Sequence, residues 1–252
     1  MHLQLIRNAT LRLSYAGRTI LIDPDLAAKH SRPSFTGRSP NPMVDLPLAA
    51  AEVVAGIDLV IVSHLHRDHF DAVELIPVAL PLLCQPGDEA RIAERGFTQV
   101  TPLADILDWS GIHLTRTAGQ HGTGAVGQLM GAVAGFVFGA PGEPTIYWAG
   151  DTILYDDVHD LIEHYQPDVI ITHSCGARWP DDAGDRQLIV MDAEQTVALA
   201  QAAPNSTIIA THMEALDHAT ISRAELRAAA AAAGIPATRL LIPADGEELS
   251  FE

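Results

Sequence analysis

The chain has 252 residues and a mass of 26.9 kDa, which is enough to bury a substantial core in one large or two small domains. Hydrophobic residues make up 48% of it and charged residues 19%, and this composition excludes a disordered or fibrous protein. Lys and Arg together number 15 and Asp and Glu 32, a formal net charge of −17, so we expect no binding to nucleic acid or to an anionic membrane surface.

Short β-branched apolar runs alternate with helical stretches along the chain, which favours a layered α/β or α+β fold with a mixed sheet. The first three runs resemble a meander, with Ala16 and Gly17 forming one of its turns. The predicted strands cover residues 3–6, 10–15, 19–22, 59–63, 80–84, 113–117, 135–138, 145–149, 169–172, 207–210 and 239–242.

Capping residues predict two helices in the last quarter of the chain. Asp192, with Gln195 three residues later, indicates a helix that runs to residue 203 and ends before a proline. Ser222 and Glu225 have the same spacing and open an alanine-rich helix to residue 233. Gly234 is a suitable residue to terminate this second helix.

Residues 27–47 form the one long irregular stretch, and they contain four prolines. A loop of this length in a compact domain usually has a function, so we predict a substrate-binding lid. The cationic residues in and beyond this loop have two interpretations: they either bind a small anionic substrate or keep the loops soluble. These residues are Lys29, Arg32, Arg38 and Arg178.

Three features favour a cytoplasmic protein. Residues 1–17 lack the basic stretch and apolar core of a signal peptide. Cys84 and Cys175 are too few for a disulfide framework. The apolar run at residues 126–140 is interrupted by glycines and is shorter than the roughly 20 residues of a membrane span, so we expect glycine-spaced strands near an active-site wall. We expect a small-molecule substrate and no membrane partner, and the sequence leaves open whether the chain forms a homo-oligomer.

The strongest chemical signal lies at residues 59–70, whose sequence is Leu-Val-Ile-Val-Ser-His-Leu-His-Arg-Asp-His-Phe. An apolar strand runs directly into His64, His66, Asp68 and His69. Three imidazoles and a carboxylate at this spacing suit Zn, Fe or Mn rather than a metal that prefers thiolates. A solvated polar turn is the alternative interpretation, but such a turn has no need of three histidines beside an apolar strand.

This motif resembles that of the metallo-β-lactamase-fold superfamily, whose members also have a third histidine, a bridging aspartate and a final histidine. His121, Asp151 and His212 each stand just after a predicted strand, as that resemblance requires. The resemblance implies a single domain over residues 1–252, built as a four-layer αββα sandwich of two mixed β-sheets flanked by helices.

The resemblance also implies two divalent metal ions, most favourably Zn²⁺, with Mn²⁺ or Fe as alternatives. It assigns His64, His66 and His121 to one ion, Asp68, His69 and His212 to the other, and Asp151 to both. Asp68 and Asp151 are therefore also expected to take part in catalysis. His173 follows the predicted strand 169–172, where it could contact substrate or act as an acid.

The beginning of the chain narrows the resemblance further. Residues 7–10 and the Asp23-Pro24 pair resemble the ascorbate-6-phosphate lactonase and related metal-dependent hydrolases, although many of these have a histidine where this chain has Asn8. Asp23 either supports a ligating imidazole or simply ends a strand in a turn.

The expected function is hydrolysis of a small ester, lactone or phosphoester substrate. If two ions sit about 3.5–4 Å apart, a hydroxide between them would be the nucleophile, because metal coordination lowers the pKa of water to around 7. Two other readings of the sequence remain open: an iron-dependent oxidoreductase of the same fold and a non-catalytic metal-binding protein.

Overall fold

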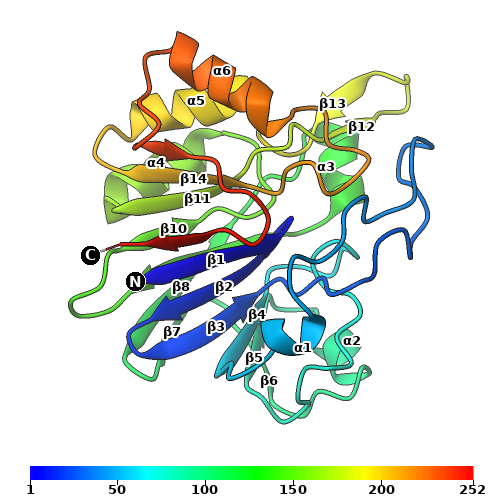
Figure 1. Cartoon of the computed structure of the whole chain (residues 1–252), viewed down its shortest axis with the longest axis vertical. Coiled ribbons are helices and arrows are strands. Elements are labelled where there is room, and N and C mark those ends of the chain that lie inside the picture. Colours follow the sequence, from blue (N-terminus) through cyan, green and yellow to red (C-terminus); the bar gives the residue numbers. More distant parts are fainter. Residues whose placement is uncertain (252) are drawn as a thin grey trace.

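The computed structural model describes residues 1–251, and Figure 1 shows their arrangement. Two seven-stranded mixed sheets within these residues pack against each other, and helices cover their outer faces. The predicted four-layer αββα sandwich is therefore confirmed. The two chain ends lie side by side at one edge, where β1 pairs with the final strand.

The first sheet combines an antiparallel meander with a parallel half. The strands β1, β2 and β3 pair antiparallel, as predicted, and β3 is followed by three parallel neighbours. In spatial order the sheet comprises β16 (Glu248–Ser250), β1 (His2–Arg7), β2 (Thr10–Tyr15), β3 (Arg18–Ile22), β4 (Leu59–Val62), β5 (Leu82–Cys84) and β6 (Val100–Pro102).

The second sheet has the same mixed character, with an antiparallel half from β7 to β10 and a parallel half from β10 to β15. Its spatial order is β15 (Leu240–Leu241), β14 (Thr207–Thr211), β11 (Val169–His173), β10 (Ile146–Trp148), β9 (Ala134–Gly139), β8 (Ile112–Ala118) and β7 (Ile106–Trp109). A separate hairpin joins β12 (Arg178–Pro180) to β13 (Arg186–Leu188).

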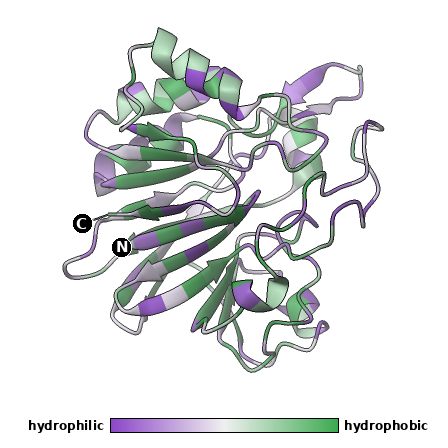
Figure 2. Cartoon of the chain, in the orientation of Figure 1, coloured by the Kyte–Doolittle hydropathy of each residue, from purple (hydrophilic) through white to green (hydrophobic). Residues whose placement is uncertain are grey.

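Alternation of apolar side chains along the strands builds the core between the sheets. Leu11 and Leu13 of β2 point to the same face of the first sheet and meet Phe136, Phe138 and other side chains of the second. Figure 2 shows hydrophobic residues concentrated in the strands of both sheets. Burial of this surface from both sides makes the strands a rigid base for the loops at their ends.

Helices complete the outer layers. On the second sheet lie α4 (Asp156–Tyr165), α5 (Ala193–Ala202) and α6 (Arg223–Ala232), and on the first lie α1 (Ala50–Val53) and α2 (Glu89–Ala93). The predicted caps of α5 and α6 are confirmed, because Asp192 accepts from Gln195 N and Ser222 shares a capping box with Glu225. None of the helices in the described residues has the length and apolar character to cross a bilayer.

The apolar run at residues 126–140 differs from its prediction. Its first part belongs to a helix, α3 (Gly124–Met130), and only the second part forms the strand β9. Gly127 allows the helix to approach the preceding loop, since a Cβ at this position would lie 2.8 Å from the carbonyl oxygen of Gly122. The expectation of strands throughout this run is therefore wrong.

Candidate metal centre

The predicted ligands converge at one end of the sandwich, where loops follow four different strands. His64, His66, Asp68 and His69 lie in the loop after β4, and the remaining three follow β8, β10 and β14. These three are His121, Asp151 and His212. The convergence arises because strands of two packed sheets end at a common edge.

A first group comprises His64, His66, His121 and Asp151, whose ligand atoms all lie within 4.8 Å of one another. Asp151 Oδ2 is 3.5 Å from His121 Nε2 and 3.9 Å from His64 Nε2. Tetrahedral ligands with bonds of about 2.0–2.2 Å to one ion are separated by about 3.3–3.6 Å. The first group therefore has dimensions suited to a single metal ion.

A second group also contains Asp151, because ligand atoms of His69, Asp151, His173 and His212 lie within 4.8 Å of one another. His69 Nε2 is 3.2 Å from Asp151 Oδ2, and His212 Nε2 is 3.7 Å from Asp151 Oδ1. Asp68 Oδ2 completes this group at 3.3 Å from His212 Nε2 and 3.7 Å from His69 Nε2. The structure thus brings together all seven residues that the sequence suggested, with Asp151 between two sets of three.

The nitrogens that face these two groups have no hydrogen-bond partner within residues 1–251. They are Nε2 of His64, His69 and His212, all three buried, and the buried Nε2 of His173 also lacks a partner. Buried polar atoms almost always have a partner, and a neutral imidazole offers its lone pair to a cation. The unpartnered nitrogens and nearby carboxylates form a donor set that fits divalent metal ions.

On three of the imidazoles the opposite ring nitrogen is held by a specific partner, which fixes the orientation of that ring. His69 Nδ1 lies 2.7 Å from Asp23 Oδ2, and His121 Nδ1 lies 2.8 Å from the carbonyl oxygen of Ile189. His64 Nδ1 lies 2.9 Å from Ser63 Oγ. Donation through Nδ1 leaves Nε2 free to bind metal, so these contacts select the required tautomer. Asp23 thus follows the end of β3 and also contacts the imidazole of a candidate ligand.

The charge state of the centre follows from its burial and from its carboxylates. Burial lowers the pKa of His64 well below its ordinary value, so this imidazole is neutral at pH 7. Burial raises the pKa of Asp151, but the adjacent imidazoles, His69 foremost, outweigh it and hold this pKa well below its usual range. Burial lowers the pKa of His69, but Asp151 and Asp68 raise it to about 10. Positive charge, as a proton or as a metal ion, is therefore favoured between these carboxylates.

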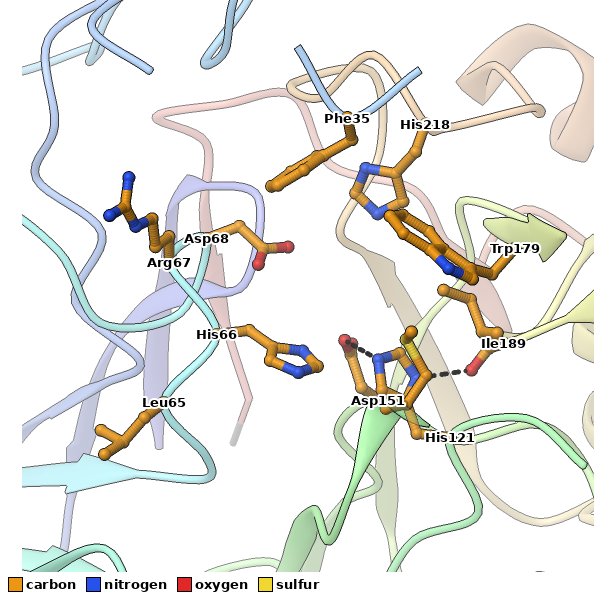
Figure 3. A pocket seen from close by; sticks show the side chains of 11 residues that line it. Phe35, Leu65, His66, Arg67, Asp68, His121, Asp151, Trp179, Ile189 and His218 are labelled. Atoms are coloured by element: carbon orange, nitrogen blue, oxygen red, sulfur yellow. Dashed lines mark hydrogen bonds and ion pairs between the residues drawn. The ribbon is translucent and has the colours of Figure 1, made fainter. Parts of the chain in front are cut away.

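A cavity of about 290 Å³ opens directly over the centre, and Figure 3 shows the side chains around it. His66, Asp68, His121 and Asp151 contribute candidate ligands to its lining. The remaining lining consists mainly of carbon: Phe35, Leu65, Met130, Trp179 and Ile189, together with Arg67 and His218. Apart from the candidate ligands, Arg67 and His218, the wall is therefore apolar.

Phe35 belongs to the irregular loop that follows β3, and this loop lies at the same end of the sandwich as α3 and the β12–β13 hairpin (Figure 1). The ring of Phe35 packs edge-on against His218, with centroids 5.1 Å apart. The sequence identified the loop, but it gave no signal for Phe35 or Trp179. Both positions depend on contacts between distant segments.

The cationic side chains of the loops serve to hold those loops in place. Arg32 pairs with Asp25 at 2.7 Å, Arg178 pairs with Asp192 at 3.1 Å, and Arg38 donates to the carbonyl oxygen of Ala219 at 3.0 Å. Lys29 is exposed and lies outside the cavity lining, and the Arg67 guanidinium points away from His66 and His121 (Figure 3). The structure favours loop ordering over recruitment of an anionic substrate.

Comparison with known proteins identifies the family. Residues 18–213 match the model of the beta-lactamase superfamily domain. The chain belongs to this superfamily. Over 259 aligned residues it is also 38% identical to the UPF0173 protein YddR of Bacillus subtilis strain 168, with 100% of both chains covered. The UPF0173 metal-dependent hydrolase of Xanthobacter autotrophicus is 30% identical over 65% of this chain and 67% of its own length. Within this superfamily, the chain belongs to the UPF0173 family of metal-dependent hydrolases.

Two solved structures of the superfamily are similar over nearly their whole length. A possible metal-dependent hydrolase from Veillonella parvula is 33% identical, with a TM-score of 0.93 and coverage of 100% of this chain and 99% of that one. An isothiocyanate hydrolase from Delia radicum gut bacteria is 36% identical, with a TM-score of 0.92 and the same coverage. The resemblance to the metallo-β-lactamase fold is confirmed, whereas membership of the lactonase-like branch stays a prediction.

Proposed function

We propose that this protein is a dinuclear zinc hydrolase of small, uncharged electrophiles that carry an apolar substituent, with isothiocyanates as the leading substrate class. The observation that carries this proposal is the position of the apolar cavity directly over the two ligand groups. A substrate bound there places its reactive atom at the centre and its apolar substituent against the wall. The 36% identical isothiocyanate hydrolase supports the choice of substrate class.

The donor set favours zinc at both positions. Imidazole and carboxylate ligands in near-tetrahedral groups are typical of Zn²⁺ sites in enzymes. His64, His66 and His121 would hold one ion, Asp68, His69 and His212 the other, and Asp151 both. When bound, the ions lower the pKa of water and polarise the substrate.

The protein's own side chains position the attacking water and the substrate, and they exclude other water from the cavity. Asp68 lines the cavity as well as the second group, so its carboxylate is placed to accept a hydrogen bond from the attacking water. Phe35, in the loop after β3, and Trp179, in β12, line the cavity and bind the apolar substituent. Water is excluded from this part of the cavity because its walls offer few hydrogen-bonding groups.

Hydrolysis of an isothiocyanate needs water alone as co-reactant. The oxygen of water bonds to the central carbon of R–N=C=S, the bond between carbon and nitrogen breaks, and both protons of water pass to the nitrogen. The products are the amine R–NH₂ and carbonyl sulfide. No oxidant enters this balance, which separates the proposed reaction from the iron-dependent oxidoreductase alternative.

Uncharged lactones and esters also suit the apolar wall, and they form the second substrate class to examine. A phosphoester is less suited because its charge calls for cationic or donor groups, and Arg32, Arg38 and Arg178 are engaged in structural contacts. Arg67 belongs to the cavity lining, but its guanidinium points away from His66 and His121 (Figure 3). Fold analogy does not distinguish among these classes, since one fold hosts many reactions.

The test begins with the metal content of protein purified without added metal. We expect two equivalents of zinc, followed by turnover of benzyl isothiocyanate in a panel that also contains a γ-lactone, 4-nitrophenyl acetate and bis(4-nitrophenyl) phosphate. Stoichiometric redox-active iron would favour the oxidoreductase, and preferred cleavage of the phosphodiester would overturn the proposed substrate class. Zinc binding without turnover of any of these compounds would support the non-catalytic alternative.

Two variants test the role of the centre in the same assay. We expect His64→Ala and Asp151→Ala to abolish turnover while unfolding stays cooperative. His113→Ala is the matched control, because His113 is an exposed histidine that pairs with the exposed Asp108 and belongs to neither ligand group. Full activity in either centre variant would contradict the proposal.

A further inference from the structure

His173 is a fully buried histidine next to the candidate metal centre, and none of the roles proposed above uses it. It is the last residue of β11, and its Nδ1 lies 2.6 Å from Asp151 Oδ1. It does not belong to the residues that line the cavity. A direct contact with substrate, which the sequence suggested for this residue, therefore has no support in the structure.

The 2.6 Å separation distinguishes a hydrogen bond from shared metal coordination. Two ligands of one ion, with bonds of about 2.0–2.2 Å, would need an angle well below 90° at the metal to come this close. The other contacts of Asp151 are longer, from 3.2 Å to His69 Nε2 to 3.9 Å to His64 Nε2, and these separations do suit shared coordination. His173 thus donates to Asp151 through Nδ1–H, since the carboxylate can only accept.

The backbone and neighbours of His173 make it a rigid donor. Its strand β11 lies between β10 and β14, and His173 itself pairs with Thr211. The indole of Trp148 contacts the imidazole edge-on, with ring centroids 5.1 Å apart. A side chain packed in the middle of a sheet holds its direction better than one in a loop.

We propose that His173 is a positioning residue that fixes the carboxylate plane of Asp151 and thereby allows this one aspartate to serve both ligand groups. The inference rests on the dinuclear centre proposed above. The carboxylate torsion of aspartate is intrinsically soft, so an unrestrained Asp151 would sample orientations in which one group loses an oxygen ligand. The hydrogen bond to Oδ1 restrains this torsion, with Oδ2 directed at His69 and His121.

Two isosteric variants separate this role from metal ligation. In His173→Asn the amide nitrogen occupies the place of Nδ1, and in His173→Gln it occupies the place of Nε2. The readouts are zinc affinity by competition with a chelator, the number of zinc ions bound, and the visible spectrum of the Co²⁺-substituted protein. None of these readouts requires a substrate, so a wrong substrate class would not affect them.

We expect His173→Asn to keep zinc affinity within about threefold of the wild type and to keep its Co²⁺ spectrum. His173→Gln should lose about 10- to 100-fold in affinity at one or both positions, as is typical when a partner of a metal ligand is removed. The opposite order would identify His173 as a ligand through Nε2 and overturn the proposal. Equal affinity in both variants, whether intact or impaired, would also overturn it, and a wild type that binds fewer than two zinc ions would instead refute the dinuclear centre.

Discussion

Asp23 and His69 are joined by a hydrogen bond of 2.7 Å, although 46 residues separate them in the chain. The same carboxylate accepts hydrogen bonds from the backbone nitrogen and the hydroxyl of Ser63, both at 2.7 Å. Asp23 therefore holds the two ends of the histidine-rich loop to the end of β3. This contact links the first sheet directly to the orientation of a candidate ligand.

Replacement of Asp23 by asparagine should weaken zinc binding by about 10- to 100-fold. Asparagine tolerates the left-handed backbone that Asp23 adopts, with φ of 46°, so the turn should persist. Its amide nitrogen, however, would meet Nδ1 of His69 as a donor and favour the tautomer with a proton on Nε2. Chelator competition measures the loss, and Asp108→Asn is the control at an exposed carboxylate. Unchanged affinity in Asp23→Asn would show that the tautomer of His69 is not set by this contact.

The parts of the fold that the sequence predicted well are those that local pattern determines. Alternation of apolar residues defined β2 with its observed bounds, and the box of Ser222 and Glu225 defined the start of α6. The sequence gave no prediction for α4, which begins after Tyr155 without a side-chain cap. Its apolar positions 158, 161, 162 and 165 have helical spacing and could have revealed it. The edge strands β6, β7 and β16 escaped prediction because exposed residues interrupt their pattern.

Trp179→Ala should raise the KM for an apolar substrate by about 5- to 20-fold and leave kcat within a few-fold. Loss of part of an apolar wall removes about 1–2 kcal/mol of binding that ground and transition states share. The comparison of benzyl with methyl isothiocyanate sharpens this test, since only the larger substituent reaches the wall. Leu129→Ala is the control, because Leu129 is 66% exposed and lies outside the cavity. An equal rise in KM for both substrates would show that the apolar substituent does not bind against Trp179.

Asp217 should make the order of the loop after β3 dependent on pH. Its buried carboxylate accepts hydrogen bonds from the backbone nitrogens of Phe35 and Thr36 and from the side chain of Asn41 at 2.7 Å. Burial raises the pKa of Asp217, but hydrogen bonds from Ser34 and its neighbours outweigh burial and hold this pKa far below its usual range. The stability that the carboxylate contributes is therefore complete above about pH 4, the unfolded-state pKa, and is lost progressively as the pH falls further.

Asp217→Asn should lower the free energy of unfolding by about 2–4 kcal/mol at pH 7, because the amide cannot accept from all these donors. The deficit should shrink below pH 4, where the wild-type carboxylate loses its advantage. Urea denaturation at pH 7 and pH 3 measures it, with a chelator in every sample so that loss of metal does not contribute. Asp182→Asn, at an exposed carboxylate, should show no deficit at either pH. If the loss of unfolding free energy in Asp217→Asn grew as the pH fell, the pKa of Asp217 would be raised in the folded protein and not lowered.

The candidate ligands were predictable and the cavity walls were not, for a physical reason. Ligation restricts residue type, so His64, His121 and Asp151 stand out wherever they follow apolar strands. An apolar wall accepts many side chains, and Phe35 reaches it only because Asp217, far along the chain, anchors the surrounding loop. His173 was predictable only in part: its position after a strand was evident from the sequence, but its partner Asp151 was evident only from the structure.

Gly135→Ala should destabilise the protein by about 1–3 kcal/mol and also weaken metal binding. A Cβ at this position in β9 would lie 2.5 Å from Thr117 Oγ1, 2.8 Å from the carbonyl oxygen of Trp148 and 2.9 Å from that of Ala149. The neighbouring strand β10 must shift to relieve these contacts, and Asp151 follows that strand three residues after its end. Gly139→Ala is the matched control at the end of the same strand, since a Cβ there meets nothing within 4 Å and should change stability by less than about 0.5 kcal/mol. Denaturant unfolding and chelator competition measure the two effects. If Gly135→Ala lowers stability but leaves zinc affinity unchanged, the position of Asp151 is set by its own contacts, His173 among them, and not by the packing of β9 against β10.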